Sequence, residues 1–172
     1  AFQLRHGAFA YDTPAPRAER GFDYNHIDLD SIQIRLQDVR YSNLDISGRI
    51  EQLAAVAPGD FRLMEARGRI DFSPDTIAAE GLTLTTGRSR LSLPSGLITL
   101  PDTTAALDEM RLQLQLEEAS ISPRDAAYFV PQLTDYEVVR HNLDRPLRLR
   151  AETSGTLAGL QVHRLQFDGW NS

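Results

Sequence analysis

The stretch that decides the fold class is residues 61–93, FRLMEARGRIDFSPDTIAAEGLTLTTGRSRLSL. Apolar or small residues alternate with polar ones before and after Ser73-Pro74-Asp75, which has the composition of a tight turn. A period of two places the apolar side chains on one face of a β-strand and the polar side chains on the other. The stretch therefore predicts a strand, a turn and a second strand, followed by a third strand after Gly87.

The same alternation recurs through most of the chain and predicts a mainly β protein. It is most regular in MRLQLQLE at residues 110–117, and it returns near residue 147. The residues that these two segments place on one apolar face are Met110, Leu112, Leu114, Leu116, Leu147 and Leu149. About ten short strands are expected, with Leu53 to Asp60 as a connection and Ser95-Gly96 as a break between strands.

One segment, SPRDAAYF at residues 122–129, has the signature of a helix start. Ser122 suits the N-cap, Pro123 suits the first helical position and Asp125 meets the positive end of the helix dipole. Pro131 ends the helix after about two turns. Tyr128 and Phe129 are then expected to pack this helix against the end of the sheet.

The expected fold is an antiparallel meander that forms a curved or folded sheet, or alternatively a sandwich, with one short helix near residues 122–130. No repeat and no linker divides the chain, so residues 1–172 are expected to be a single domain. Because the chain begins at Ala1, it is expected to be a mature chain or a piece of a longer one.

Composition excludes several classes of function. The formal net charge of −6 and the absence of a basic cluster argue against a nucleic-acid partner. The absence of cysteine excludes disulfides and thiolate metal sites. No apolar run in the sequence approaches the roughly 20 residues that a membrane-spanning helix needs.

The sequence contains no strong catalytic or metal-binding motif. The four histidines lack metal-ligand spacing. His26 lies near Asn25, Asp28 and Asp30, which could form a weak metal or acid–base site. These residues alternate with Ile27 and Leu29, so a solvated strand face is the favoured interpretation. We therefore expect a binding protein without a cofactor and not an enzyme.

The apolar stripe at residues 110–117 has two interpretations that composition does not separate. It is either the core of a plain sandwich or the lining of an open groove for acyl chains. A third, lower-ranked expectation is a carbohydrate-binding sandwich that uses Trp170 and tyrosines.

A succession of segments resembles the translocation and assembly module (TamB) family of Bacteroidetes, within the AsmA-like superfamily. The segments are GFDYNHIDLDSIQIRL (21–36), ISGRIEQL (46–53), FRL (61–63), LTLTTGRSRL (82–91), SISPRDAAYFVPQL (120–133) and AETSGTLAGLQVHRLQF (151–167). The resemblance covers most of the chain. This chain departs from the family pattern at APGDF (57–61), where an E-x-S-G-F segment is expected.

The resemblance implies a periplasmic segment of a long protein anchored in the inner membrane of a diderm bacterium. Such proteins form a gutter of β-strands with an apolar lining, and they are implicated in phospholipid transport to the outer membrane. The expected ligands are phospholipid acyl chains that contact the apolar stripe. The alternative is a scaffold for outer-membrane protein assembly by strand pairing, with a barrel partner of the TamA or BamA type.

Overall fold

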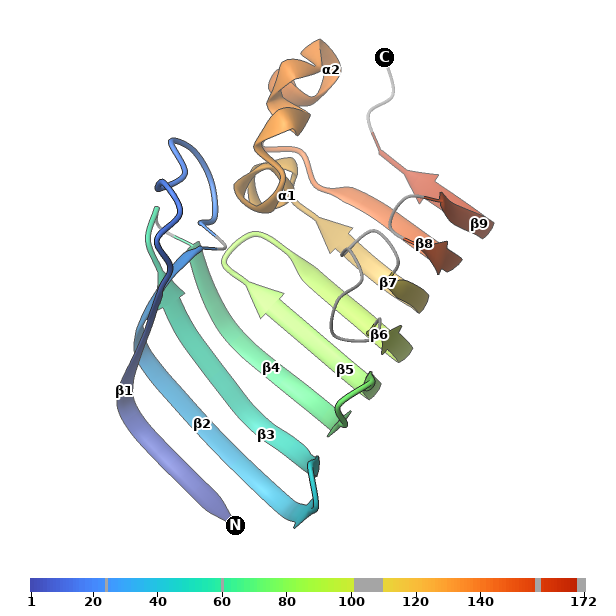
Figure 1. The fold of residues 1–172 in the computed structure, drawn as a ribbon. Coiled ribbons are helices and arrows are strands. Elements are labelled where there is room, and N and C mark those ends of the chain that lie inside the picture. Colours follow the sequence, from blue (N-terminus) through green and yellow to red (C-terminus); the bar gives the residue numbers. More distant parts are fainter. Residues whose placement is uncertain (24, 60, 101–109, 157–158, 170–172) are drawn as a thin grey trace.

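A computed structural model describes residues 1–23, 25–59, 61–100, 110–156 and 159–169, which form one antiparallel sheet of nine strands. Each strand pairs with the strands before and after it in sequence (Figure 1). The strands are β1 (Phe2–Asp12), β2 (His26–Ser42), β3 (Asp45–Ala57), β4 (Phe61–Phe72), β5 (Thr76–Thr86), β6 (Arg90–Thr99), β7 (Arg111–Ile121), β8 (Leu147–Thr156) and β9 (Gly159–Asp168). The predicted mainly β meander is confirmed.

A helical segment separates β7 from β8. It contains α1 (Pro123–Phe129), the 3₁₀ helix η2 (Pro131–Asp135) and α2 (Glu137–Arg140). The helix predicted near residues 122–130 is confirmed, with Ser122 at the N-cap and Pro123 at the first helical position. The Ser122 hydroxyl makes no capping hydrogen bond and instead donates to the carbonyl of Leu143.

The register of the sheet separates apolar from polar side chains across its whole width. Cross-strand partners share a face, so a row of partners can be followed from one edge to the other. One such row is apolar at every strand: Leu4, Ile34, Leu53, Ala66, Leu84, Leu91, Ala119, Leu149 and Phe167. A second row is polar from β2 to β9: Gln37, Arg49, Arg69, Glu80, Ser95, Gln115, Glu152 and Arg164. We call the corresponding sides of the sheet the apolar face and the polar face.

No second layer covers the apolar face in the described part of the chain. Extensive contacts between elements occur between neighbouring strands and within the helical segment. Among the described residues, the buried hydrophobic ones are Ile50 and four alanines, and none of their large side chains is fully buried. The chain exposes 11996 Å², whereas a compact protein of its mass exposes about 8,400 Å². The sandwich alternative is therefore not what the structure shows.

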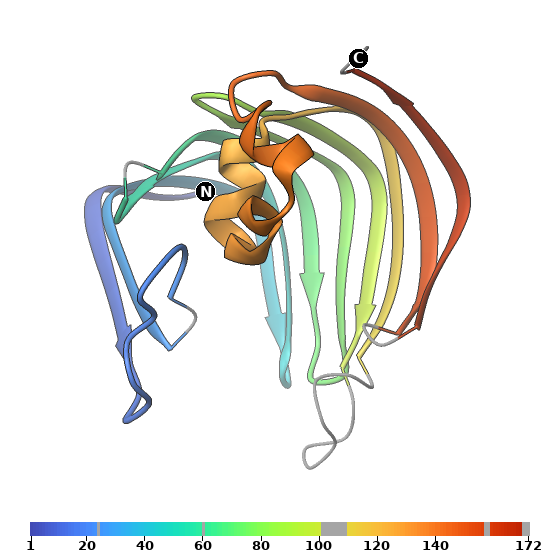
Figure 2. The same cartoon turned by 90° about the horizontal axis from the view of Figure 1, so that it is seen from above.

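The sheet is strongly curved, and the helical segment lies inside the curve (Figure 2). In β7, Leu112, Leu114 and Leu116 are half-buried, while the polar residues between them are exposed. On a single curved sheet, side chains lie closest together on the concave side. The half-burial of these leucines therefore places them on that side. Phe61 belongs to the apolar face, as the partner of Ala57, and stacks on Tyr128 of α1. The apolar face is therefore the concave one.

Two of the predicted boundaries are wrong. Residues 53–57 are not a connection but the end of β3, because Leu53 pairs with both Ile34 and Ala66. Ser95-Gly96 is not a break, because β6 runs through it and Gly96 pairs with Ala79 and Leu114. A Cβ on Gly96 would lie 2.8 Å from Leu93 Cδ2, so glycine there leaves room for a leucine of the same strand.

The described strands are also longer than predicted, from 10 residues in β6 to 17 in β2. The slip in the pattern at Asp30-Ser31 is a bulge within β2, where Ser31 has a φ of 54°. The bulge takes up one residue, so the apolar positions before and after it stay on the same face. Phe2–Asp12 likewise forms one bulged strand.

Candidate functional site

The candidate site is the concave apolar face, which we call the apolar groove. Its floor consists of aliphatic side chains from neighbouring strands, and its width spans β1 to β9. Nothing in the described part of the chain covers it except the helical segment at one margin. An exposed apolar surface of this extent, which no other part of the described chain covers, is typical of an interaction site.

The structure brings most of the predicted lipid-facing residues together. Leu112, Leu114 and Leu116 lie opposite Gly155, Thr153 and Ala151 of β8. Leu147 and Leu149 continue the same face, opposite Ile121 and Ala119 of β7. These five leucines therefore form one continuous aliphatic area of the groove. Met110 is half-buried and lies just before β7.

Sequence reasoning did not include small residues among the candidate site residues. Ala66 and Ala151 belong to alternating apolar positions, but these two alanines and Ala119 were not assigned to the lipid-facing stripe; all three are buried. Their place in the rows of partners could have been found by aligning the strands in antiparallel register. Alanine side chains at these positions extend only a methyl group from the sheet, so they leave space above the floor of the groove.

An aromatic cluster closes one margin of the groove. Tyr128 stacks on Phe61 with ring centroids 4.9 Å apart, and Phe129 meets Phe61 edge-on at 5.0 Å. Phe22, from the loop between β1 and β2, packs against both helix residues at 5.8 Å and 5.5 Å. The Tyr128 hydroxyl donates to the carbonyl of Pro58, and burial raises the pKa of this phenol, which keeps it a neutral donor. The predicted packing of α1 against the end of the sheet is confirmed.

A buried carboxylate fixes α1 to the turn between β5 and β6. The Asp125 carboxylate accepts hydrogen bonds of 2.6 Å from both the Thr86 and the Ser89 hydroxyls, and Arg88 Nη1 lies 3.5 Å away. The Ser89 hydroxyl in turn accepts from the backbone N–H of Ser122. Every polar atom of this cluster therefore has a partner, and its role is to hold the margin of the groove in place.

His26 belongs to a local hydrogen-bonded cluster. Its Nδ1 lies 3.0 Å from Asp23 Oδ2, and its Nε2 lies 3.1 Å from the carbonyl oxygen of Thr13. The pKa of Asp23 is lowered below 3.8, first by the backbone N–H of Ala18 and also by Asn25 and His26. Among the described residues, no group of three histidines or acids is placed to hold a metal ion.

Both edge strands expose large apolar side chains. Phe2 and Phe9 of β1 are 53% and 50% exposed, and Leu165 and Phe167 of β9 are 58% and 66% exposed. Each edge strand pairs on one side within the described residues, so its outer backbone groups are open to a further strand. Trp170, which the sequence analysis considered for carbohydrate binding, lies outside the described residues.

Two further observations concern membrane-spanning helices and similarity to known proteins. No helix in the described ranges has the length and apolar character needed to cross a bilayer. Comparison of the chain with protein-family models, with curated proteins and with solved structures gave no match. The function is therefore argued from the residues of this chain.

Proposed function

We propose that this chain carries phospholipid acyl chains in its apolar groove, as a segment of a periplasmic conduit between the inner and outer membranes. The observation that carries the proposal is the uninterrupted apolar row from Leu4 in β1 to Phe167 in β9. A row that crosses every strand offers a lipid tail a continuous apolar path in the direction in which the strands are stacked.

The energetics favour an acyl chain as the occupant. Each methylene removed from water contributes about 0.8 kcal/mol, and an extended chain can lie along aliphatic side chains without needing hydrogen bonds. The nearest polar rows face the opposite side, so no charge has to be desolvated along this path. The sequence resemblance to TamB proteins supports the same function and the periplasmic location.

Photo-crosslinking tests this proposal. A photoreactive amino acid at Leu149, which lies on the apolar face, should crosslink to co-expressed phospholipid. The same amino acid at Gln113, an exposed position on the polar face of the adjacent strand β7, is the control and should give little product. Equal labelling at the two positions, or no labelling at Leu149, would contradict the proposal.

A second candidate function is assembly of outer-membrane proteins by strand pairing. The observation that favours it is the open edge of β9, which is ten residues long and exposes Val162, Leu165 and Phe167. An extended client strand would add to this edge through backbone hydrogen bonds. Capture of unfolded barrel strands that is lost when a proline replaces an outward-facing residue of β9 would favour this function over lipid transport.

A further inference from the structure

A second feature lies on the opposite side of the sheet from the groove. The polar face over β6 to β9 contains a hollow of about 460 Å³. It lies beside a bulge in β7, where residues 117 and 118 both face Arg150 between the pairs Leu116–Ala151 and Ala119–Leu149. Bulges bend and twist a strand, so this one changes the local course of β7 next to Arg150.

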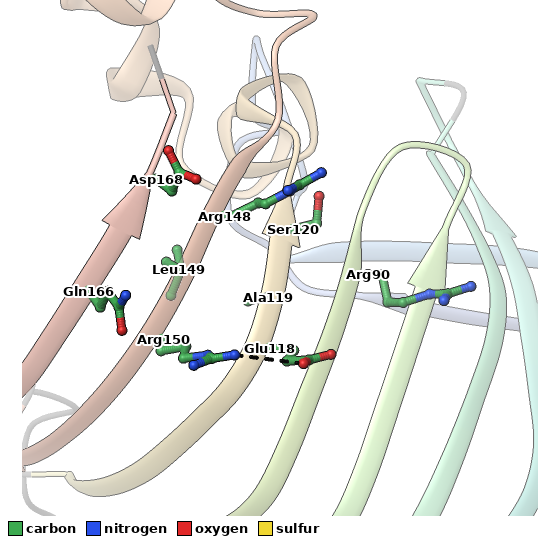
Figure 3. Close-up of a pocket in the computed structure, with 9 residues that line it drawn as sticks. All are labelled: Arg90, Glu118, Ala119, Ser120, Arg148, Leu149, Arg150, Gln166 and Asp168. Carbon is green, nitrogen blue, oxygen red and sulfur yellow. Dashed lines mark ion pairs between the residues drawn. The ribbon is translucent and has the colours of Figure 1, made fainter. Parts of the chain in front are cut away.

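Three arginines are among the residues that line this hollow. Ser120 lies in the middle strand, with Arg90 of β6 and Arg148 of β8 as its direct partners on either side. In Figure 3, Arg148 and Arg150 extend from β8 toward β7, and Ser120 lies beside Arg148, whereas Arg90 extends away from them. We call the set Arg90, Ser120, Arg148 and Arg150 the arginine hollow.

The positive charge in the hollow is incompletely balanced. Arg90 and Arg148 form no ion pair or hydrogen bond with the described residues, although Asp168 is the β9 partner of Arg148. Arg150 lies 3.8 Å from Glu118, but both side chains are well exposed, at 58% and 79%. An exposed pair at this distance contributes little, so Arg150 can exchange Glu118 for a stronger anion.

The donor geometry selects the class of anion. Arg148 and Arg150 are two residues apart on the same face of one strand, and the Ser120 hydroxyl lies on the strand beside them. Donors that approach from several directions fit the tetrahedral oxygens of a phosphate, whereas a planar carboxylate is satisfied by a single guanidinium. We propose that the arginine hollow binds a phosphate group, with Arg148 and Arg150 as its main contacts and Arg90 adding long-range attraction.

This site is independent of the proposed function, because it lies on the polar face and needs no lipid in the groove. The phosphate could belong to a free phosphorylated metabolite or to a lipid head group at a membrane surface. Three probes separate these sources: inorganic phosphate, glycerol 3-phosphate, and vesicles of phosphatidylcholine with or without phosphatidylglycerol.

The test follows the arginine Nε–H signals of the ¹⁵N-labelled chain by NMR during titration with each probe. Saturable shifts of the Arg148 and Arg150 signals are expected, and the Arg148→Gln variant should bind about tenfold more weakly, since a charge-assisted contact is lost. The matched control is Arg49→Gln, which removes an exposed arginine from the polar face in β3, far along the sheet from β8.

Each outcome decides the proposal. Binding of the soluble phosphates identifies a metabolite site, and binding of anionic vesicles alone identifies a head-group site. Absence of saturable shifts with all three probes would overturn the proposal. It would also be overturned if Arg49→Gln weakened binding as much as Arg148→Gln, because general attraction to net charge would then explain the result. Circular dichroism of each variant establishes that the sheet is intact.

Discussion

Asp125 has two roles in the structure, one at the start of α1 and one at the turn between β5 and β6. The sequence analysis placed it at the third helical position because an acid stabilises the positive end of a helix. In the structure it is also 6% exposed and accepts hydrogen bonds from two hydroxyls of the turn between β5 and β6. The spacing in sequence reveals the first role, but the second depends on a turn 36 residues away.

Replacement of Asp125 by alanine should destabilise the protein. The hydroxyls of Thr86 and Ser89 would lose a charged partner in a buried place, which typically costs about 2–4 kcal/mol. Urea denaturation monitored by circular dichroism measures the change. The control is Asp135→Ala, an exposed acid in η2, for which a change within about 0.5 kcal/mol is expected. Equal effects of the two substitutions would contradict the role given to Asp125.

Asp23 gives the loop between β1 and β2 a pH dependence. Its carboxylate accepts from the backbone N–H groups of Ala18 and Asn25 and from His26, and these contacts lower its pKa below 3.8. A depressed pKa in the folded state means that the stabilisation is complete above the unfolded pKa. It is lost as the pH falls through the lower, folded value.

The Asp23→Asn variant should therefore be less stable than the wild type at pH 6, and the difference should shrink as the pH falls below about 4. Urea midpoints measured from pH 2.5 to 6.5, within the range set by these carboxyl pKa values, provide the comparison. A stability difference that stays constant with pH would show that the Asp23 carboxylate is not held in its charged form.

At the scale of elements, periodicity predicted the strands well and their ends less well. The turn at Ser73-Pro74-Asp75 is present, and its Ser73 N–H donates to the carbonyl of Thr76. The strand at residues 53–57 was missed because LAAVA lacks alternation, and its pairing with β2 and β4 cannot be read from local sequence. Tertiary pairing thus overrides weak local signals in this sheet.

The groove was predicted only in part, again because local sequence does not show how the strands pair. The leucines of β7 and β8 stood out because polar residues separate them, so the stripe could be assigned to one face from sequence. The sequence left open whether a second sheet covers that stripe. This question depends on the curvature and length of the nine described strands, to which bulges contribute, such as the one at Ser31 and the one at Gly81 in β5, opposite Gly68.

Gly68 in β4 is the strongest test of this curvature. It has a φ of 150°, and a Cβ at this position would lie 2.7 Å from the Cα of Leu82 in the next strand. Gly68→Ala should lower the free energy of unfolding by about 2–4 kcal/mol, since the clash involves backbone. Thermal unfolding measures the loss. Gly87→Ala, where a Cβ meets nothing within 4 Å, is the control and should leave the melting temperature nearly unchanged.

At the scale of the whole molecule, the described residues form a single curved sheet with few fully buried side chains. It spreads its apolar side chains over one concave face and its charges over the other, and this arrangement accounts for its surface area of 11996 Å². Stability then comes chiefly from the backbone hydrogen bonds of a long meander and from half-burial along the groove. Exposure of so much apolar surface to water is unfavourable, and an apolar ligand of the kind proposed would cover it.

The central claim is that acyl chains fill the apolar groove, and native mass spectrometry of the purified chain tests it most directly. The wild type and the Gln113→Glu variant, which changes the exposed polar face of β7, should carry phospholipid adducts. Leu114→Glu, which places a charge in the groove one residue later, should lose most of them while circular dichroism still shows an intact sheet. A wild-type chain without lipid, or equal lipid occupancy in all three proteins, would contradict the claim.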